Sequence, residues 1–350
     1  MAIDKTPLPK SLSTLAIGSV PFLDPAEAIE QSAVTLDIPA SPQLVRLSAW
    51  EDMLFSAVSG LPALVVDEQA RTVTAVSEGR EEALAHFYEQ YFTGDVEFLA
   101  LGEKSRLGFD SLLQRAKIDE NFGRSYLKAQ VVGPLTFGQS VKVQGAYSLA
   151  DDAALLEAAA LGLGGKAAWA AERIRELNRI PVVFLDEPGL SGYGSAFSTL
   201  TPQTVVSALS SAVDAARAKG PVLVGCHVCG NTDWGLLTQV GLDIINFDAY
   251  AYLEAVCLYP KQFKTFLDGG GALCWGIVPT TDFDESRHTS ERLSKMIKDG
   301  WSNLASKGID KELLRERTLI ASACGLGGLS IETAKSILAM LPKVAQALVD

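Results

Sequence analysis

Residues 221–230 read PVLVGCHVCG, an apolar run that ends in a histidine flanked by two cysteines. The run 221–226 is short, apolar and rich in valine, which predicts a strand buried on both faces. A strand of this kind is typical of a parallel sheet covered by helices. The segment therefore predicts a sheet architecture and, where the strand ends, a turn rich in side chains that bind metals.

Six further runs of this kind recur along the chain, and helix-like segments separate them. The seven predicted strands are 14–18, 127–132, 181–186, 221–226, 243–247, 272–277 and 318–323. The predicted helices are 24–35, 79–92, 150–179, 202–219, 285–308 and 330–348, and several follow an Asp, Ser or Thr cap. Two weaker runs, 61–67 and 95–101, compete for an eighth strand, and one of them also suits an accessory hairpin. This alternation predicts a parallel sheet that is either closed or doubly wound.

Polar residues stand at the ends of several predicted strands, namely Ser19, Asp186, His227, Asp248 and Cys324. The carboxyl ends of all the strands converge at one mouth in a closed barrel, whereas an open sheet spreads them along a line. We therefore expect an α/β fold, a (β/α)8 TIM barrel with N-terminal insertions, formed as a single domain by residues 1–350.

The composition excludes several classes of protein. A barrel of this type uses about 250 residues and tolerates insertions, so 350 residues with 48% hydrophobic content suit one large core. A formal charge of -12 disfavours nucleic acid as a partner. The chain has no apolar run of the roughly 20 residues that span a bilayer, and its start lacks the apolar region of a secretory signal. We expect a cytoplasmic protein.

Five cysteines, an odd number in a large chain, argue against a disulfide framework. In extended backbone, His227 and Cys229 point to the same side, so both can reach one ion. Cys324, at the end of a later strand, is the candidate third ligand, and Asp248 offers an oxygen. Cysteines 257 and 274 are expected to be small buried residues, and histidines 86 and 288 to lie at the surface. A redox role for the pair 226 and 229 stays a second interpretation.

Two thiolates and an imidazole favour zinc, and three protein ligands leave one position exchangeable, as in catalytic sites. A divalent zinc ion with two cysteinates and neutral His227 carries no net charge, and a carboxylate from Asp248 would add one negative charge. Coordination deprotonates a thiol, and such an electron-rich ligand set leaves the bound sulfur nucleophilic. The set therefore favours sulfur alkylation over activation of water.

Three other segments are candidates for substrate binding. In the stretch DEPG (186–189), one carboxylate of the adjacent pair can face the barrel mouth and would pair with an ammonium group. In IGSVP (17–21), the glycine allows a close approach and Ser19 supplies an N–H and a hydroxyl for a carboxylate. A helix cap and a structural turn are the alternative interpretations. GPLT (133–136) and GLGGLS (325–330) are interpreted as segments that shape the pocket and position Cys324.

Taken together, these residues resemble the C-terminal catalytic barrel of cobalamin-independent methionine synthase, in the superfamily that includes uroporphyrinogen decarboxylase. The resemblance runs from Ser13 to Leu329. It rests on IGSVP (17–21), VVGPLT (131–136), LDEPGL (185–190), HVC (227–229), DIINFD (243–248) and ACGL (323–326), in that order.

The resemblance implies a zinc-dependent methyltransferase that converts homocysteine to methionine. It assigns His227, Cys229 and Cys324 as zinc ligands and places Asp248 where the family has a glutamate ligand. Ile17 and Ser19 match positions that bind the homocysteine carboxylate, and Asp186 matches one that binds its amino group. Glu51 is a candidate for a second amino-binding glutamate, on a poor local match.

Two departures from the family bear on the methyl donor. First, the family has a histidine at the tip of the strand that corresponds to CWGIVPT (274–280), where this chain has Val278 or a neighbour. Second, this chain lacks the long N-terminal half of the full-length methionine synthase. Methyltetrahydrofolate needs protonation of its leaving nitrogen, whereas methylcobalamin has a better leaving group. The departures therefore favour methylcobalamin, presented by a separate corrinoid protein, over methyltetrahydrofolate.

Three rival functions stay open at the level of the sequence. The segment HVCGNT (227–232) also resembles the corresponding motif of methylcobalamin:coenzyme M methyltransferases. Their substrate, coenzyme M, carries a sulfonate and no amine. A metal-free enzyme resembling uroporphyrinogen decarboxylase is the second alternative. A corrinoid-binding module without catalytic activity is the third.

Overall fold

The computed structural model describes residues 6–195 and 198–349 of the chain. Within these residues, seven strands form one parallel sheet in the order β1-β11-β10-β9-β8-β7-β4. They are β1 (Thr14–Leu15), β4 (Tyr126–Val132), β7 (Ile180–Asp186), β8 (Leu223–Val228), β9 (Ile244–Asp248), β10 (Ala272–Val278) and β11 (Thr318–Ser322). Each coincides with one of the seven predicted strands.

An irregular segment, residues 38–43, closes the barrel between β1 and β4. On one side Ile38 and Gln43 bridge to Leu15 and Ser19, and on the other Ala40 bridges to Lys128. The prediction that residues 61–67 or 95–101 supply the eighth strand is wrong. Prolines in 38–43 interrupt the strand pattern, because proline has no N–H to donate, and this hides the segment from a search for apolar runs.

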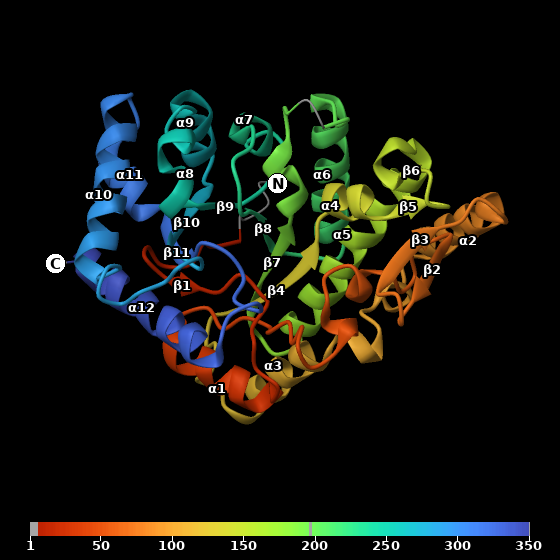
Figure 1. The fold of residues 1–350 in the computed structure, drawn as a ribbon, viewed down its shortest axis with the longest axis horizontal. Coiled ribbons are helices and arrows are strands. Elements are labelled where there is room, and N and C mark those ends of the chain that lie inside the picture. The colour runs from red at the N-terminus through yellow and green to blue at the C-terminus, as the bar shows by residue number, and fades with distance from the viewer. Residues whose placement is uncertain (1–5, 196–197, 350) are drawn as a thin grey trace.

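Helices surround the sheet and bury its outer face, apart from the helix 80–93, which lies beside an accessory sheet (Figure 1). The described chain has twelve α-helices in all. They are α1 (Pro25–Thr35), α2 (Arg80–Thr93), α3 (Leu107–Ile118), α4 (Pro134–Ser140), α5 (Ala153–Arg175), α6 (Pro202–Arg217), α7 (Trp234–Leu237), α8 (Ala249–Val256), α9 (Pro260–Asp268), α10 (Ser290–Ser306), α11 (Lys311–Glu316) and α12 (Ile331–Val349). All six predicted helices are present. Helix α10 starts later than predicted because Thr289 caps it and the preceding residues 284–288 form a turn.

The residues that the seven strands of the barrel direct inward form a separate apolar cluster at its centre, which includes Leu15, Val182, Phe184, Ile244 and Leu319. Side chains alternate along a strand, so Asp186, two residues after Phe184, and His227, four residues after Leu223, point to the same interior nearer the carboxyl ends. The apolar cluster therefore forms the floor beneath the predicted site.

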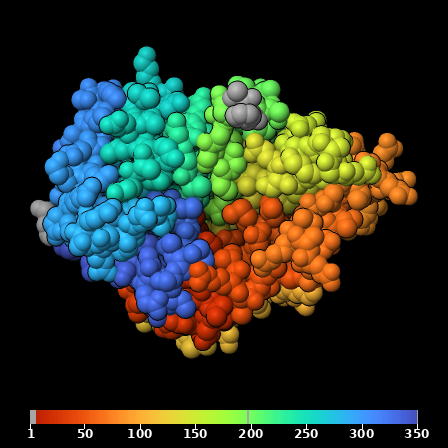
Figure 2. All heavy atoms as spheres, in the orientation of Figure 1, coloured from red at the N-terminus to blue at the C-terminus, as the bar shows by residue number. Residues whose placement is uncertain are grey.

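Residues 61–148 also carry an accessory sheet with the strand order β2-β3-β5-β6, made of β2 (Leu64–Asp67), β3 (Thr72–Ala75), β5 (Lys142–Val143) and β6 (Tyr147–Ser148). With α2 it forms the projecting edge of the molecule in Figures 1 and 2. The run 61–67 thus belongs to an accessory hairpin, and 95–101 contains the 3-10 turn Val96–Leu99 instead of a strand. Among the described residues, none of the helices is both long and apolar enough to cross a membrane.

Candidate metal centre

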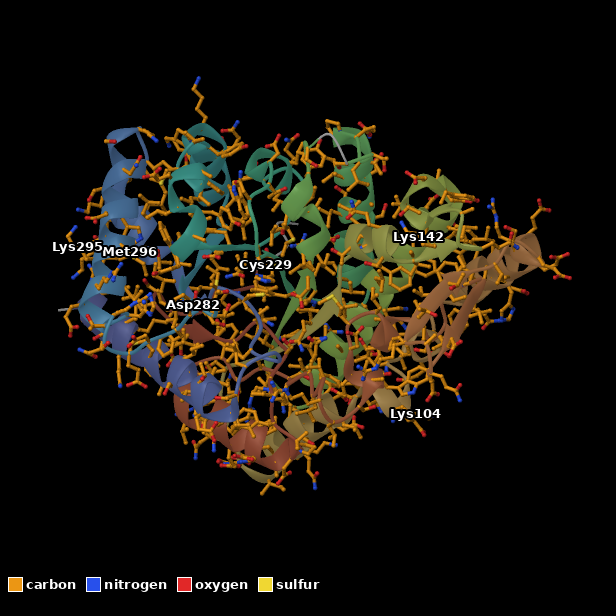
Figure 3. All side chains as sticks on the ribbon, viewed as in Figure 1. Lys104, Lys142, Cys229, Asp282, Lys295 and Met296 are labelled. Atoms are coloured by element: carbon orange, nitrogen blue, oxygen red, sulfur yellow. The ribbon has the colours of Figure 1, made fainter. Side chains whose placement is uncertain are left out.

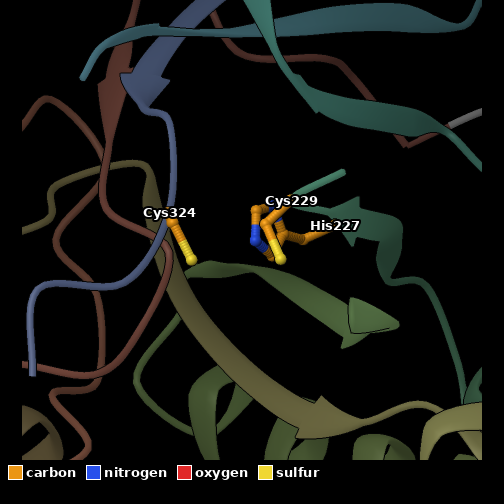
Figure 4. A group of neighbouring side chains, drawn as sticks. All are labelled: His227, Cys229 and Cys324. Atoms are coloured by element: carbon orange, nitrogen blue, oxygen red, sulfur yellow. The ribbon is translucent and has the colours of Figure 1, made fainter. Parts of the chain in front are cut away.

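Two strand ends bring the three predicted ligands together. Strand β8 carries His227 on its inward face and Cys229 follows the strand, while Cys324 lies two residues beyond β11. One ligand atom from each residue lies within 4.8 Å of the other two. Figure 3 places Cys229 near the middle of the molecule, and Figure 4 shows the sulfur of Cys324 directed toward His227 and Cys229 from the opposite side.

The donor set and its spacing fit zinc. In a tetrahedral site with Zn–S bonds of about 2.3 Å and Zn–N bonds of about 2.0 Å, neighbouring ligand atoms lie roughly 3.3 to 3.8 Å apart. The observed group therefore needs only a small contraction to surround an ion. Three protein ligands at the mouth of a barrel would leave a fourth position for a substrate atom.

Hydrogen bonds within the group favour the loss of one proton, that of Cys229. The pKa of Cys229 is lowered, because its thiolate accepts hydrogen bonds from Cys324 and from His227. The pKa of Cys324 is raised in turn by its hydrogen bond to Cys229 and by burial. Burial lowers the pKa of His227, but its hydrogen bond to Cys229 and the charge of Asp186 outweigh burial and raise it. A cation would displace the shared protons and take the electron pairs of all three side chains.

Asp186 lies beside this group, at the end of β7 and in register with His227 on β8. Its side chain is 3% exposed, and its Oδ1 has no hydrogen-bond partner among the described residues. Burial raises the pKa of Asp186 to about 6, against the opposing effect of Lys128 and His227. A buried carboxylate oxygen with no partner is costly unless a ligand donates to it, so this atom marks a position for a hydrogen-bond donor.

The neighbouring Glu187 has a structural role, which agrees with the expectation that only one carboxylate of the pair faces the mouth. Its carboxylate accepts from the backbone N–H groups of Leu135 and Thr136, at 2.9 and 2.7 Å, and from the Thr136 hydroxyl at 2.6 Å. Glu187 therefore holds the first turn of α4, the helix that begins in the GPLT segment.

Ser19 packs against the loop that carries Cys324. Its carbonyl accepts from the N–H of Leu326 at 2.7 Å. A Cβ on Gly325 would lie 2.2 Å from the Ser19 hydroxyl oxygen, so the loop can approach only because that position is glycine. The predicted carboxylate-binding segment 17–21 is thus in direct contact with the loop that follows Cys324.

Sequence reasoning missed Lys128, which lies inside the barrel on β4. Its ammonium group donates to the carbonyl of Ile17 and, at 3.2 Å, to Oε1 of Gln130, and it lies 4.6 Å from the centre of the Phe184 ring. Burial lowers the pKa of Lys128 to about 8, opposed by the charge of Asp186. A lysine inside a strand that is otherwise apolar was the signal available in the sequence.

Sequence reasoning also missed Asn246, a polar residue within the apolar run DIINF. It is fully buried on β9, and its Oδ1 contacts Nδ1 of His227. Its Nδ2 donates to the carbonyl of Cys274 at 2.9 Å. Asn246 therefore belongs to the surroundings of the predicted metal ligands.

Two other predicted site residues make backbone contacts. Asp248 caps α8, with Oδ1 accepting from the N–H of Ala251 at 2.8 Å, and within the described chain it does not join the three clustered ligands. Its role as a fourth ligand stays a prediction. Glu51 is buried and accepts from the N–H groups of Leu44 and Leu107, at 3.2 and 2.8 Å, so its carboxylate is already engaged.

The remaining cysteines and histidines lie outside the cluster. Cys257 and Cys274 are buried, as predicted, and Cys226 is buried in the layer between sheet and helices, on the opposite side of β8 from His227. The expectation that His288 lies at the surface is wrong. Its ring is 1% exposed, contacts the hydroxyl of Tyr250 at 3.0 Å and stacks on Phe283.

The sequence matches no protein-family model and no curated protein. The fold is similar to a solved structure described as a B12-independent methionine synthase from Shewanella sp. W3-18-1 in complex with selenomethionine, with a TM-score of 0.60. The superposition covers 97% of this chain and 98% of that chain, at 14% sequence identity. A likeness at this identity shows the fold alone, and it confirms the predicted barrel over 97% of this chain.

Proposed function

We propose that the chain is a zinc-dependent methyltransferase that transfers a methyl group to the sulfur of a thiol, with homocysteine as acceptor and methionine as product. The observation that carries the proposal is the cluster of His227, Cys229 and Cys324 at the barrel mouth, beside a buried Asp186 oxygen with no protein partner. The name of the structural neighbour, a methionine synthase, supports the same reaction.

His227, Cys229 and Cys324 would hold the zinc ion. When bound, zinc supplies the positive charge that lowers the pKa of a substrate thiol toward neutrality. The two cysteines reduce the net charge of the site, which keeps the substrate sulfur nucleophilic. His227 is 3% exposed, whereas Cys229 and Cys324 are partly exposed, so a substrate sulfur could approach the ion from the side of the cysteines.

The side chains around the cluster suit an amino acid that carries a thiol. The unpartnered Oδ1 of Asp186 can accept a hydrogen bond from an ammonium group, the strong charge-assisted kind. Ser19 lies beside the loop of Cys324, whereas Ile17 is buried in the apolar cluster at the barrel centre and its carbonyl accepts from Lys128. In the proposal, the backbone of Ile17 and the hydroxyl and backbone of Ser19 would bind the substrate carboxylate. An amine and a carboxylate recognised at two points would orient the sulfur toward the metal ligands.

The unpartnered Asp186 oxygen favours homocysteine over coenzyme M, because coenzyme M has no amine and would leave this oxygen unsatisfied. The clustered ligands favour a metal-dependent reaction over a metal-free decarboxylation.

The methyl donor is a separate part of the proposal. The sequence favours methylcobalamin, since the tip of β10 carries the buried Val278 in place of a histidine. The neighbour's description as B12-independent supports methyltetrahydrofolate instead. His288, in the loop after β10, is the histidine nearest in sequence to that tip, but its contacts are with Tyr250 and the backbone of Asp284.

The test is an activity matrix of thiols against methyl donors on zinc-loaded protein, with the methylated product identified by mass spectrometry. Homocysteine, coenzyme M and a thiol acid without an amine are each combined with methylcobalamin and with methyltetrahydrofolate. We expect methionine as the main product, with methylcobalamin as donor. Turnover with methyltetrahydrofolate alone would overturn the donor assignment, and absence of any thiol methylation would overturn the proposed function.

A further inference from the structure

His227, Asn246 and Cys274 occupy equivalent positions on three adjacent parallel strands. His227 on β8 is the register partner of Asn246 on β9, and Asn246 is the register partner of Cys274 on β10. Because partners in a parallel sheet direct their side chains to the same face, the three residues share one level of the barrel interior. Asn246 is 0% exposed, so no water competes for its amide.

The orientation of the Asn246 amide is set by the backbone of β10. The carbonyl oxygen of Cys274 can only accept a hydrogen bond, and it lies 2.9 Å from Nδ2 of Asn246. A flipped amide would place two oxygens at that distance, which is repulsive. Burial raises the pKa of the Cys274 thiol to about 12, opposed by a hydrogen bond with Asn246, so the side chain of Cys274 lies within reach of the same amide.

The Oδ1 of Asn246 is therefore directed at His227, where it contacts Nδ1 of the imidazole. An amide oxygen can only accept, so Nδ1 must carry the proton. In the neutral ring this leaves the lone pair on Nε2, the ring nitrogen that does not contact Asn246. The backbone of β10 thus determines, through one amide, which nitrogen of His227 is available as a ligand.

We propose that Asn246 is a positioning residue that holds His227 in the tautomer and orientation needed to bind the metal through Nε2. This inference rests on the metal site of the proposed function but not on its methyl donor or acceptor. A hydrogen bond from the second ring nitrogen of a ligating histidine fixes the ring and strengthens its basicity. Asn246 supplies that bond in a part of the barrel where a charged partner would be costly to bury.

The test compares two substitutions of similar size. Asn246→Asp keeps an oxygen facing His227, whereas Asn246→Leu removes it. Removal of such a partner typically weakens metal binding about 10- to 100-fold, so we expect a loss of that size in zinc affinity for the leucine variant. The aspartate variant keeps the oxygen that faces His227 but loses the hydrogen bond to the Cys274 carbonyl, so we expect a clearly smaller loss for it. Zinc affinity is measured by competition with a chromophoric chelator. Equal losses in both variants would overturn the proposal.

Thr318→Val serves as the matched control. Thr318 is also fully buried on a barrel strand, and its hydroxyl contacts Trp301 and the carbonyl of Leu314, away from the metal ligands. The control should lose thermal stability while its zinc affinity stays at the wild-type value. A comparable fall in zinc affinity in Thr318→Val would mean that the affinity reports general destabilisation, and the role assigned to Asn246 would be abandoned.

A second measurement does not need a variant that folds or a bound metal. The chain has 3 histidines, so 15N-histidine spectra are simple enough to assign. In metal-free wild-type protein, at alkaline pH where the imidazole is neutral, we expect His227 to carry its proton on Nδ1. A proton on Nε2 would overturn the proposal. If the wild type shows the expected tautomer but binds no zinc, the proposed function fails while the positioning of His227 by Asn246 stands.

Discussion

Replacement of Asp186 by asparagine tests the assignment of this residue to the substrate amine. The side chain is 3% exposed and Oδ1 has no partner among the described residues, so an ammonium group would bind there without competition from water or protein. A hydrogen bond between charged partners contributes about 1.5 to 3 kcal/mol. Since each 1.4 kcal/mol is tenfold, kcat/KM for homocysteine should fall roughly 10- to 140-fold in Asp186→Asn.

The assay compares homocysteine with γ-mercaptobutyrate, the same thiol acid without the amine, on wild type and Asp186→Asn. Homocysteine should lose the predicted factor, whereas γ-mercaptobutyrate should be used by both proteins at nearly the same low rate. Zinc content is measured in parallel, because Asp186 lies in register with His227. Equal losses for both thiols with full zinc occupancy would refute the assignment.

The pH dependence of kcat/KM tests the same interaction between Asp186 and the substrate amine. Burial raises the pKa of Asp186 to about 6, so the free protein carries a protonated, neutral side chain below that pH and an ionised one above it. Because kcat/KM reports groups of the free enzyme, the preference for homocysteine over γ-mercaptobutyrate should decline as the pH falls through about 6. In Asp186→Asn this decline should be absent, and its persistence would assign it to another group.

Three further predictions concern the metal, the Cys324 loop and Glu51. Cys324→Ser should lower zinc content and abolish thiol methylation, whereas Cys257→Ser, outside the cluster, should leave zinc content unchanged in elemental analysis. Gly325→Ala places a Cβ 2.2 Å from the Ser19 hydroxyl oxygen, so this variant should have a raised KM for homocysteine in steady-state kinetics. A Cβ at Gly328 meets no atom within 4 Å, so the control variant Gly328→Ala should have the kinetic constants of the wild type. Glu51→Gln weakens two buried hydrogen bonds to the backbone, so its free energy of unfolding in urea titrations should fall by about 1 to 3 kcal/mol. Its KM for homocysteine should stay unchanged. A large rise in KM with unchanged stability would instead support amine binding by Glu51.

Local sequence patterns were sufficient to predict the regular strands and the three residues that the structure brings together as candidate metal ligands. Each of the seven predicted strands is a short apolar run, and a run buried on both faces has the same signature wherever it stands in the chain. The spacing of His227 and Cys229 follows from strand geometry, since residues two apart share a face. The pairing with Cys324 followed from the rule that strand ends of a barrel converge.

The features that were missed depend on contacts between distant segments. The segment 38–43 closes the barrel through bridges to β1 and β4, but its amino-acid composition does not predict a strand. His288 occupies a charged stretch of sequence, yet Tyr250 and Phe283 bury its ring. Which strands lie next to each other, and in what register, decides these contacts.

By itself, then, the sequence determined the barrel, the strand ends and the residues able to bind a metal. The pattern of apolar residues and the types of side chain that can bind a metal are both local properties of the chain. Only the tertiary structure decided what each polar side chain does. Asp186 and Glu187 are adjacent in sequence, but one keeps an unpartnered oxygen beside His227 and the other holds the start of α4. Asn246 acquires a role only because the register of three strands places it between His227 and the carbonyl of Cys274.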